Sequence, residues 1–313
     1  MDVAAADEIY QDNSPVIQLE VNGDVRAYGL DILVWHEIVN DVVGGVPVAV
    51  TFCPLCNSAI AFDRRLGAEA FEFGTPGLLR KSDLVMYDRT TESLWQQIGG
   101  RAIVGLMVGA RLEPLPAPVV SWGQFKKSFP DGLVLSRLTG FVFPYGENPY
   151  TGYDSFEQPT DTSLDGTSSG GDDRLSVFDR VVTIEAGADV VAYPFSALRE
   201  KRVIEDERDG RPLVVFWTPG ASSALDQALV DDGRGVGSTG VFERRLNGEL
   251  MVFQPNPDDA QTFIDQGTES TWNVFGRAVA GPLTGAQMEP FVHGNHLWFA
   301  WAAFQPDTIV VRG

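Results

Sequence analysis

Two cysteines are the residues of this sequence best suited to chemistry. Cys53 and Cys56 stand in a Cys-Pro-Leu-Cys segment that follows the apolar run 46–52, and the 313-residue chain has no other cysteine. Such a pair can be a redox dithiol, part of a zinc or copper site, or a packed or disulfide-bonded structural pair. The count excludes a four-cysteine zinc site. The residues after Cys56 predict a hairpin, whereas a thioredoxin-like pair would lead into a helix.

One histidine favours the metal alternative. His36 shares the spacing i, i+3, i+4, i+7 with Ile32, Trp35 and Val39, which places it on the buried stripe of a predicted helix. Its simplest role there is that of a core imidazole satisfied by one backbone carbonyl. A neutral imidazole beside two thiols would instead complete a Cys2His set, which suits copper or zinc. We therefore expect His36 to join the two cysteines in a metal site.

Two further histidines lie near the C-terminus. His293 and His296 form an H-x-x-H pair in the segment FVHGNHLWFAW. Side-chain alternation along a strand edge explains this pair without any ligand. If the packing of the chain carries one of the two to the cysteines, its imidazole supplies a fourth metal ligand.

Tyr87 and Arg89 are the candidates for catalytic or substrate-orienting side chains. Both lie in the polar segment YDRTTES before Trp95. We expect these three residues to line a pocket beside the cysteines, where Tyr87 and Arg89 would orient a substrate or an anionic group. Asp88, in the same segment, has a counterpart later in the chain and is expected to form a turn.

The sequence contains an internal repeat. The segment GVPVAVTFCPLCNSA (45–59) matches GRPLVVFWTPGASSA (210–224), and DRTTESLWQQIGGRAIVG (88–105) matches DQGTESTWNVFGRAVAG (265–281). A register kept over such a length indicates the duplication of a whole domain.

The repeat also serves as an internal control. Residues shared by both copies are expected to form the scaffold, and residues found in one copy only are candidates for chemistry. The second copy lacks the three candidate ligands of the first, which it replaces by Thr218, Ala221 and Lys201. The functional site is therefore expected in the first copy.

The predicted fold is mainly β, a tandem duplication of a β-rich domain with short peripheral helices. We expect a first repeat over 15–136 that carries the cysteines and His36, and a second, cysteine-free repeat over 179–313. Residues 137–178 read as an acidic connection rich in Gly, Ser and Pro. The chain is long enough for each repeat to bury its own core.

Local patterns predict particular elements. Asn-Gly pairs at 22–23 and 247–248 are strong hairpin signals, and the apolar runs 46–52 and 213–217 are typical of central strands.

Short polar residues predict where the few helices begin. Asp31 and Ser196 are expected to cap two corresponding helices, and Ser121 to begin another helix that carries Trp122 and Phe125.

Composition limits the partners of the chain. The net charge of −20, from 43 acidic and 23 basic residues, disfavours nucleic acid and anionic membranes. Acidic surface with scarce lysine resembles proteins of salt-loving microbes, and a high-GC genome would give the same bias. No apolar run is long enough to span a membrane. The acidic N-terminus lacks the features of a signal peptide.

Several longer motifs resemble the DUF3179 family. The resemblance covers nearly the whole chain and rests on four segments, HEIVN (36–40), TFCPLCNSAIAFDR (51–64), GLLRKSDLVMYDRTTESLWQQIGGRAIVG (77–105) and WFAWAAFQPDT (298–308). The family is a domain of unknown function, so the resemblance implies a shared architecture and site without a reaction. Its cysteine motif falls on Cys53 and Cys56 and its histidine on His36. Members often look exported, which implies an extracellular or cell-surface location. The absence of a signal peptide keeps a cytoplasmic location open.

These observations favour a metal-dependent redox enzyme. Copper, or alternatively zinc, would bind at the Cys/His site and act on a small-molecule substrate that the sequence does not identify. The first alternative is a non-catalytic extracellular or surface protein for binding or assembly, able to form homo-oligomers. The second alternative is a thiol-disulfide exchanger.

Overall fold

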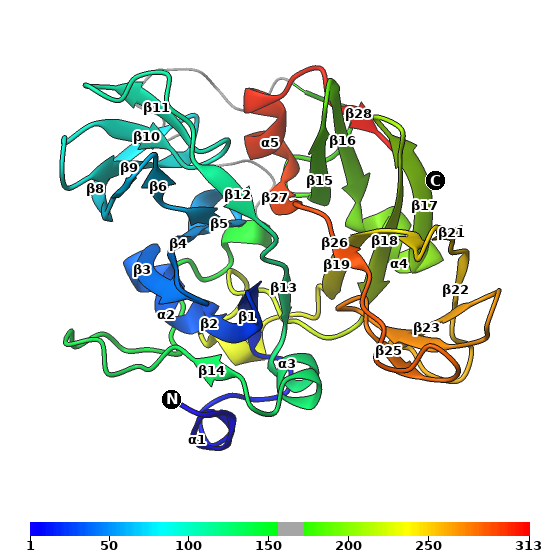
Figure 1. Cartoon of the computed structure of the whole chain (residues 1–313). Coiled ribbons are helices and arrows are strands. Elements are labelled where there is room, and N and C mark those ends of the chain that lie inside the picture. Colours follow the sequence, from blue (N-terminus) through cyan, green and yellow to red (C-terminus); the bar gives the residue numbers. More distant parts are fainter. Residues whose placement is uncertain (156–171) are drawn as a thin grey trace.

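Strands form most of the regular structure, in two halves with the same order of elements (Figure 1). The structure is a computed structural model, and it describes residues 1–155 and 172–313. The predicted mainly β fold with short helices is confirmed. Residues 156–171, which are part of the predicted connection 137–178, lie outside the described residues.

The first half, which starts near the N-terminus, is built from small sheets. One sheet has the order β13–β1–β2–β14 and comprises β13 (Val119–Ser121), β1 (Pro15–Val21), β2 (Asp24–Gly29) and β14 (Leu133–Val134). The next has the order β12–β5–β4–β3 and comprises β12 (Glu113–Leu115), β5 (Ser58–Asp63), β4 (Val46–Cys53) and β3 (Ile38–Val43). Another has the order β11–β10–β9–β8 and comprises β11 (Arg101–Val104), β10 (Leu94–Gln96), β9 (Asp83–Asp88) and β8 (Phe73–Arg80). A ribbon pairs β6 (Arg65–Leu66) with β7 (Glu69–Ala70).

The second half repeats this arrangement. Its sheet β27–β15–β16–β28 comprises β27 (Gly294–Leu297), β15 (Arg180–Ala186), β16 (Asp189–Pro194) and β28 (Ile309–Val310). The sheet β17–β18–β19–β26 comprises β17 (Val203–Arg208), β18 (Arg211–Thr218), β19 (Ser238–Glu243) and β26 (Glu289–Pro290). The sheet β22–β23–β24–β25 comprises β22 (Phe253–Pro255), β23 (Thr262–Asp265), β24 (Thr271–Asn273) and β25 (Ala278–Ala280). The ribbon pairs β20 (Arg245–Leu246) with β21 (Glu249–Leu250). The internal repeat of the sequence therefore has a counterpart in the order of the strands, while a duplication event stays a prediction.

A shared hydrogen-bond motif shows what the two copies retain as scaffold. In the first half Asp88 Oδ2 accepts a bond from Trp95 Nε1 at 2.9 Å and another from a threonine hydroxyl at 2.8 Å. In the second half Asp265 Oδ2 does the same with Trp272 Nε1 at 3.0 Å and its own threonine at 2.8 Å. The predicted role of Asp88 in a turn is confirmed.

The strand predictions are confirmed by the pairing. The Asn-Gly pair at 22–23 joins β1 to β2, and the pair at 247–248 joins β20 to β21. Strands β4 and β18, predicted as central, each lie between two antiparallel neighbours.

The helices are short, and two predicted caps are wrong. Helix α2 (Leu30–His36) begins after Gly29, so Asp31 lies in its first turn and accepts a bond from Tyr10 at 3.0 Å. Helix α4 (Phe195–Lys201) begins after Pro194, which places Ser196 inside it. In both cases the N-cap lies two residues before the predicted capping residue, at Gly29 and Pro194, and neither forms a side-chain cap hydrogen bond.

Helix α3 (Trp122–Ser128) begins at Ser121, as predicted, and the Ser121 and Gln124 side chains form a capping box. The other helical segments are α1 (Val3–Asp7), α5 (Trp298–Phe304), η1 (Pro54–Cys56), η2 (Tyr153–Ser155) and η3 (Val230–Asp232). No helix in the described part of the chain is both long and apolar enough to span a bilayer.

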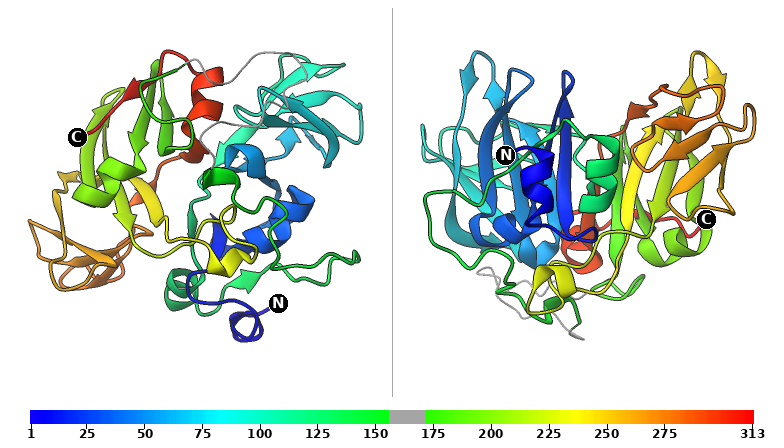
Figure 2. Two further views of the ribbon diagram at one scale, coloured as in Figure 1. Left: turned by 180° about the vertical axis from the view of Figure 1, so that it is seen from behind. Right: turned by 90° about the horizontal axis from the view of Figure 1, so that it is seen from below.

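The two halves meet along a seam. Strand β27 lies against β5, β13 lies against β19, and α5 lies against η1 (Figure 2). Across it Gln124 Nε2 donates to Thr218 Oγ1 at 2.8 Å. One hydrophobic cluster contains residues of both halves, and Cys53, Cys56 and Trp298 belong to it. The cysteines are therefore covered by the second half.

Candidate metal centre at Cys53, Cys56 and Asp83

The Cys-Pro-Leu-Cys segment forms the tip of the hairpin between β4 and β5. Cys53 ends β4 and pairs with Ser58 at the start of β5, and η1 lies between them. Asn57 has a left-handed φ of 49°, which ends the 3-10 turn and directs the chain into β5. The residues after Cys56 form strand β5, which pairs with β4, and the hairpin that follows it is the short ribbon of β6 and β7. Both cysteines are free thiols and both are buried.

Asp83 brings a carboxyl group to the two thiols. One ligand atom from each of Cys53, Cys56 and Asp83 forms a group in which all three atoms lie within 4.8 Å of one another. The turn before Asp83 contains Lys81 and Ser82, with φ values of 51° and 62° that are costly for residues with a side chain. This turn presents the Ser82 carbonyl to the cysteines. Cys56 Sγ donates to that oxygen at 3.0 Å, and Cys53 Sγ is 3.9 Å from it.

Burial raises the pKa of all three groups. It places the pKa of the Cys53 thiol above its usual range and that of Cys56 well above it. Burial also raises the pKa of Asp83 to about 6, although Ile98 N at 2.9 Å and the Gln96 amide both donate to its Oδ2. A buried anion is unfavourable unless a cation or further hydrogen bonds stabilise it. Without a cation, the site therefore favours protonated thiols.

Unpaired polar atoms surround the thiols. Ser58 Oγ, Ser82 Oγ and Asp83 Oδ1 are buried without a hydrogen-bond partner. Buried polar atoms are paired in most proteins, so each of these needs an explanation. A metal ion would use Asp83 Oδ1 directly. Two thiolates and one carboxylate are a donor set that zinc accepts, with one position of a tetrahedral ion left open. The residues present thus fit a metal ion.

His36 does not lie with the cysteines. Its ring packs against Phe141 and Phe143, with centroid distances of 5.4 Å and 5.2 Å, and its Nε2 is 2.6 Å from Tyr145 Oη. Helix α2 ends here because Glu37 takes a φ of 59°. The helical stripe therefore does not reach residue 39, and the structure forms no Cys2His group. In the ligand group described above, Asp83 stands where His36 was expected.

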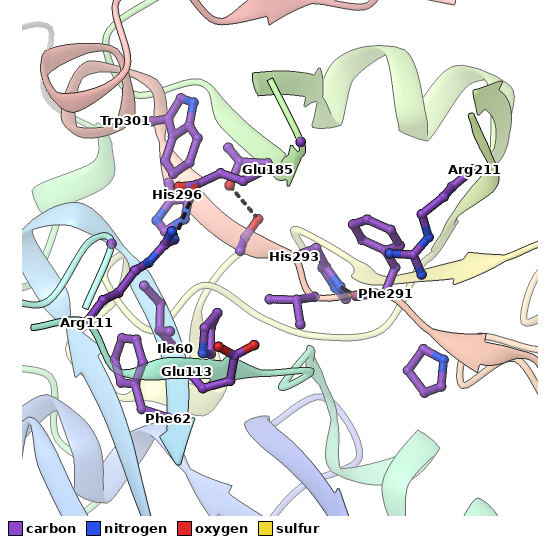
Figure 3. A pocket seen from close by; sticks show the side chains of 17 residues that line it. Ile60, Phe62, Arg111, Glu113, Glu185, Arg211, Phe291, His293, His296 and Trp301 are labelled. Carbon is purple, nitrogen blue, oxygen red and sulfur yellow. Dashed lines mark hydrogen bonds and ion pairs between the residues drawn. The ribbon is translucent and has the colours of Figure 1, made fainter. Parts of the chain in front are cut away.

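His293 and His296 line a cavity of about 460 Å³ between the halves (Figure 3). His296 is buried and stacks on Trp301 with a centroid distance of 5.0 Å, and His293 Nδ1 is 2.9 Å from Phe291 O. Burial lowers the pKa of His293 to about 4 and that of His296 to about 3. Neither imidazole belongs to the group of three ligand atoms, so the structure does not place a fourth ligand from this pair.

Tyr87 and Arg89 contact each other. Arg89 Nη1 donates to Tyr87 Oη at 3.0 Å, and its guanidinium lies 5.6 Å from the ring centroid. Tyr87 is four residues from Asp83 along β9, which is about 13 Å at the rise of a strand. Arg89 is exposed. The structure therefore places this pair at the far end of the strand from Asp83, and a catalytic role for it stays a prediction.

Comparison with known families gives a match over nearly the whole chain. Residues 1–308 match the family model described as a protein of unknown function (DUF3179). The chain belongs to the DUF3179 family. No curated protein and no solved structure gave a significant match. The resemblance drawn from the motifs is confirmed.

Asp83 is the site residue that sequence reasoning missed. A signal was present, because Asp83 directly precedes the apolar residues Leu84, Val85 and Met86 of β9 in this DUF3179 protein. Asp88 and Asp265 form matching turns and therefore align the two copies in this region. In this alignment the residue equivalent to Asp83 is Ala260. Asp83, like the cysteines, is present in one copy only, so the comparison of the two copies marks it as a candidate for chemistry.

Proposed function

We propose that this DUF3179 protein is a metal-dependent enzyme whose Cys53, Cys56 and Asp83 side chains bind one zinc or copper ion. The convergence of two thiols and a carboxyl group within 4.8 Å in a buried site carries the proposal. Three protein ligands leave one coordination position for a substrate or water, as in catalytic zinc sites. The unpaired Asp83 Oδ1 supports a cation at this place.

The donor set favours zinc over copper. Thiolates are soft ligands that suit both metals, whereas a carboxylate oxygen suits zinc better than copper(I). A zinc ion would act as a Lewis acid on a bound group, and a copper ion would give the site redox chemistry. The residues of the chain would hold the ion, exclude water through the packing of the second half, and keep Asp83 oriented through the Gln96 and Ile98 donors.

A redox dithiol is a second candidate, supported by the contact between Cys56 and the acid. Oxidation of the pair to a disulfide would pass two electrons and two protons to a small oxidant, with Asp83 placed to relay the proton of Cys56. The burial of both sulfurs disfavours exchange with protein disulfides, because an attacking thiolate must reach the bond in line.

The binding or assembly alternative has its own supporting observation. The segment after β14 extends from the body of the protein (Figure 1). It carries exposed apolar side chains. Leu138 and Val142 are 94% and 102% exposed. Concentration-dependent self-association that disappears on Leu138→Ser and Val142→Ser would support this alternative.

Cobalt(II) titration tests the metal site and distinguishes a ligand set that includes Asp83 from the predicted set that includes His36. We expect the metal-free protein to bind about one cobalt ion with thiolate-to-metal absorption and tetrahedral ligand-field bands. Asp83→Asn is expected to weaken binding by about 100-fold or more, since even outer-sphere changes cost 10–100-fold. His36→Gln is the matched control and is expected to bind as the wild type does. Tight binding that survives Asp83→Asn and is lost in His36→Gln would contradict the proposal.

A further inference from the structure

One short segment contacts both parts of the candidate metal centre. Residues 96–98 bond to Asp83 on one side and to the cysteine hairpin on the other. The donors to Asp83 are the Gln96 side-chain amide and the Ile98 backbone N–H, and both bond to Oδ2. Asp83 Oδ1 is therefore the oxygen left for a metal ion.

Gln97 makes the contacts to the cysteine hairpin. Its Nε2 donates to Thr51 Oγ1 at 2.9 Å and to Ser58 O at 3.0 Å. Thr51 lies two residues before Cys53 on β4, so the two side chains point to the same face of the sheet. Ser58 is the antiparallel partner of Cys53. The Gln97 amide therefore lies on the sheet face that carries the Cys53 thiol.

The comparison of the two halves sets Gln97 apart. Gln97 lies two residues after Trp95, and the residue two after the matching Trp272 is Val274. Both side chains are buried, with 0% and 2% exposure. Burial of an amide costs stability when its hydrogen bonding is incomplete, and Gln97 Oε1 has no partner in the described part of the chain. Because the second half holds valine at this place, packing alone does not explain the glutamine.

The threonine that accepts the Gln97 bond differs between the halves in the same way. Its equivalent in the second half is Phe216, which belongs to an apolar cluster together with other buried aromatic residues. The half without cysteines thus fills this region with apolar side chains. The half with the two thiols keeps a buried hydrogen bond between Gln97 and Thr51 instead.

We infer that Gln97 is a positioning residue of the metal centre. Its two bonds hold the cysteine hairpin, while its neighbours in the chain hold Asp83, so that the thiols and Asp83 Oδ1 converge on one ion. Hydrogen bonds outside the ligands orient them, and their loss typically weakens metal binding by about 10–100-fold. The inference rests on the proposed function, because it assigns Gln97 no role without the metal.

Cobalt(II) titration of the full chain carrying Gln97→Met tests the inference. Methionine is a flexible, apolar side chain that fills a similar space but donates no hydrogen bond. We expect binding about tenfold or more weaker than that of the wild type. We also expect the ligand-field bands at saturating cobalt to shift, because the thiolates are held less firmly. A merely structural role would lower the unfolding midpoint and leave the spectrum of the saturated protein unchanged.

Gln124→Met is the matched control. Gln124 Nε2 also donates to a threonine hydroxyl and to a backbone carbonyl, at 2.8 Å from Thr218 Oγ1 and 3.1 Å from Pro219 O. None of these residues belongs to the metal centre. The control is expected to match the wild type in cobalt affinity and spectrum, even if its unfolding midpoint falls.

Thr51→Val is the second variant, and it decides the result if Gln97→Met does not fold. Valine keeps the shape of threonine and removes the hydroxyl that accepts the Gln97 bond, so a smaller shift in the same direction is expected. Affinity and bands equal to those of the wild type in the folded variant would overturn the inference and leave the metal site in place. A wild-type protein that binds no cobalt would overturn the proposed function, and the inference with it.

Discussion

Removal of the bound metal is expected to lower the thermal midpoint of the wild-type protein by about 6 °C, since a ligand present at 1,000 times its dissociation constant stabilises by about 4 kcal/mol. The metal-free site leaves two thiols and Asp83 buried, with Ser58 Oγ and Asp83 Oδ1 unpaired. Differential scanning calorimetry before and after dialysis against a chelator measures the effect.

The double variant Cys53→Ser/Cys56→Ser is the matched control for this experiment. It keeps similar side-chain volumes but cannot bind the ion tightly, so the chelator is expected to leave its midpoint unchanged. Readdition of zinc is expected to restore the wild-type midpoint and not that of the variant. An equal chelator effect on both proteins would place the stabilising metal elsewhere.

Acidification is expected to destabilise the protein strongly through its buried histidines. The pKa values of His293 and His296, about 4 and about 3, lie below the ordinary value of 6.5. The unfolded chain therefore binds protons below pH 6.5 that the folded chain does not bind. Stability is fully present above that pH and is lost as the pH falls towards the folded pKa values. Between pH 7 and pH 5 the two residues together cost about 4 kcal/mol.

His296→Val isolates half of this effect. Urea unfolding at pH 8 and pH 5 is expected to show that the variant gains about 2 kcal/mol more over the wild type at pH 5 than at pH 8. Asp83, whose pKa is raised to about 6, affects stability in the opposite direction over the same pH range. Because Asp83 is present in both proteins, its effect cancels when the variant is compared with the wild type at each pH. A gain independent of pH would show that His296 titrates normally in the folded state.

Local signals predicted much of the fold. The Asn-Gly pairs define their hairpins because an Asn-Gly pair accommodates the positive φ values of tight turns, as Asn22 and Asn247 do here. Ser121 caps α3 because its hydroxyl meets the first free N–H groups of the helix. Asp31 and Ser196 failed as caps for the opposite reason. The N-caps of their helices lie two residues earlier, at Gly29 and Pro194, so both side chains lie inside the first turn.

The geometry of the candidate site could be predicted in part. Cys53 and Cys56 lie together because they share one hairpin tip, which is a local property. The third group was not predictable from local spacing, because Asp83 approaches from another sheet by way of the strained Lys81–Ser82 turn. His36 was predicted wrongly, since Glu37 ends the helix and the segment around Tyr145 takes up the imidazole.

Metal content and free thiols, measured together on wild-type protein purified without chelator or histidine tag, test the central claim most directly. The account predicts about one zinc or copper ion per chain. It also predicts that Cys53 and Cys56 react with a thiol reagent only after unfolding in the presence of a chelator. A protein without metal in which the two cysteines form a disulfide would contradict it.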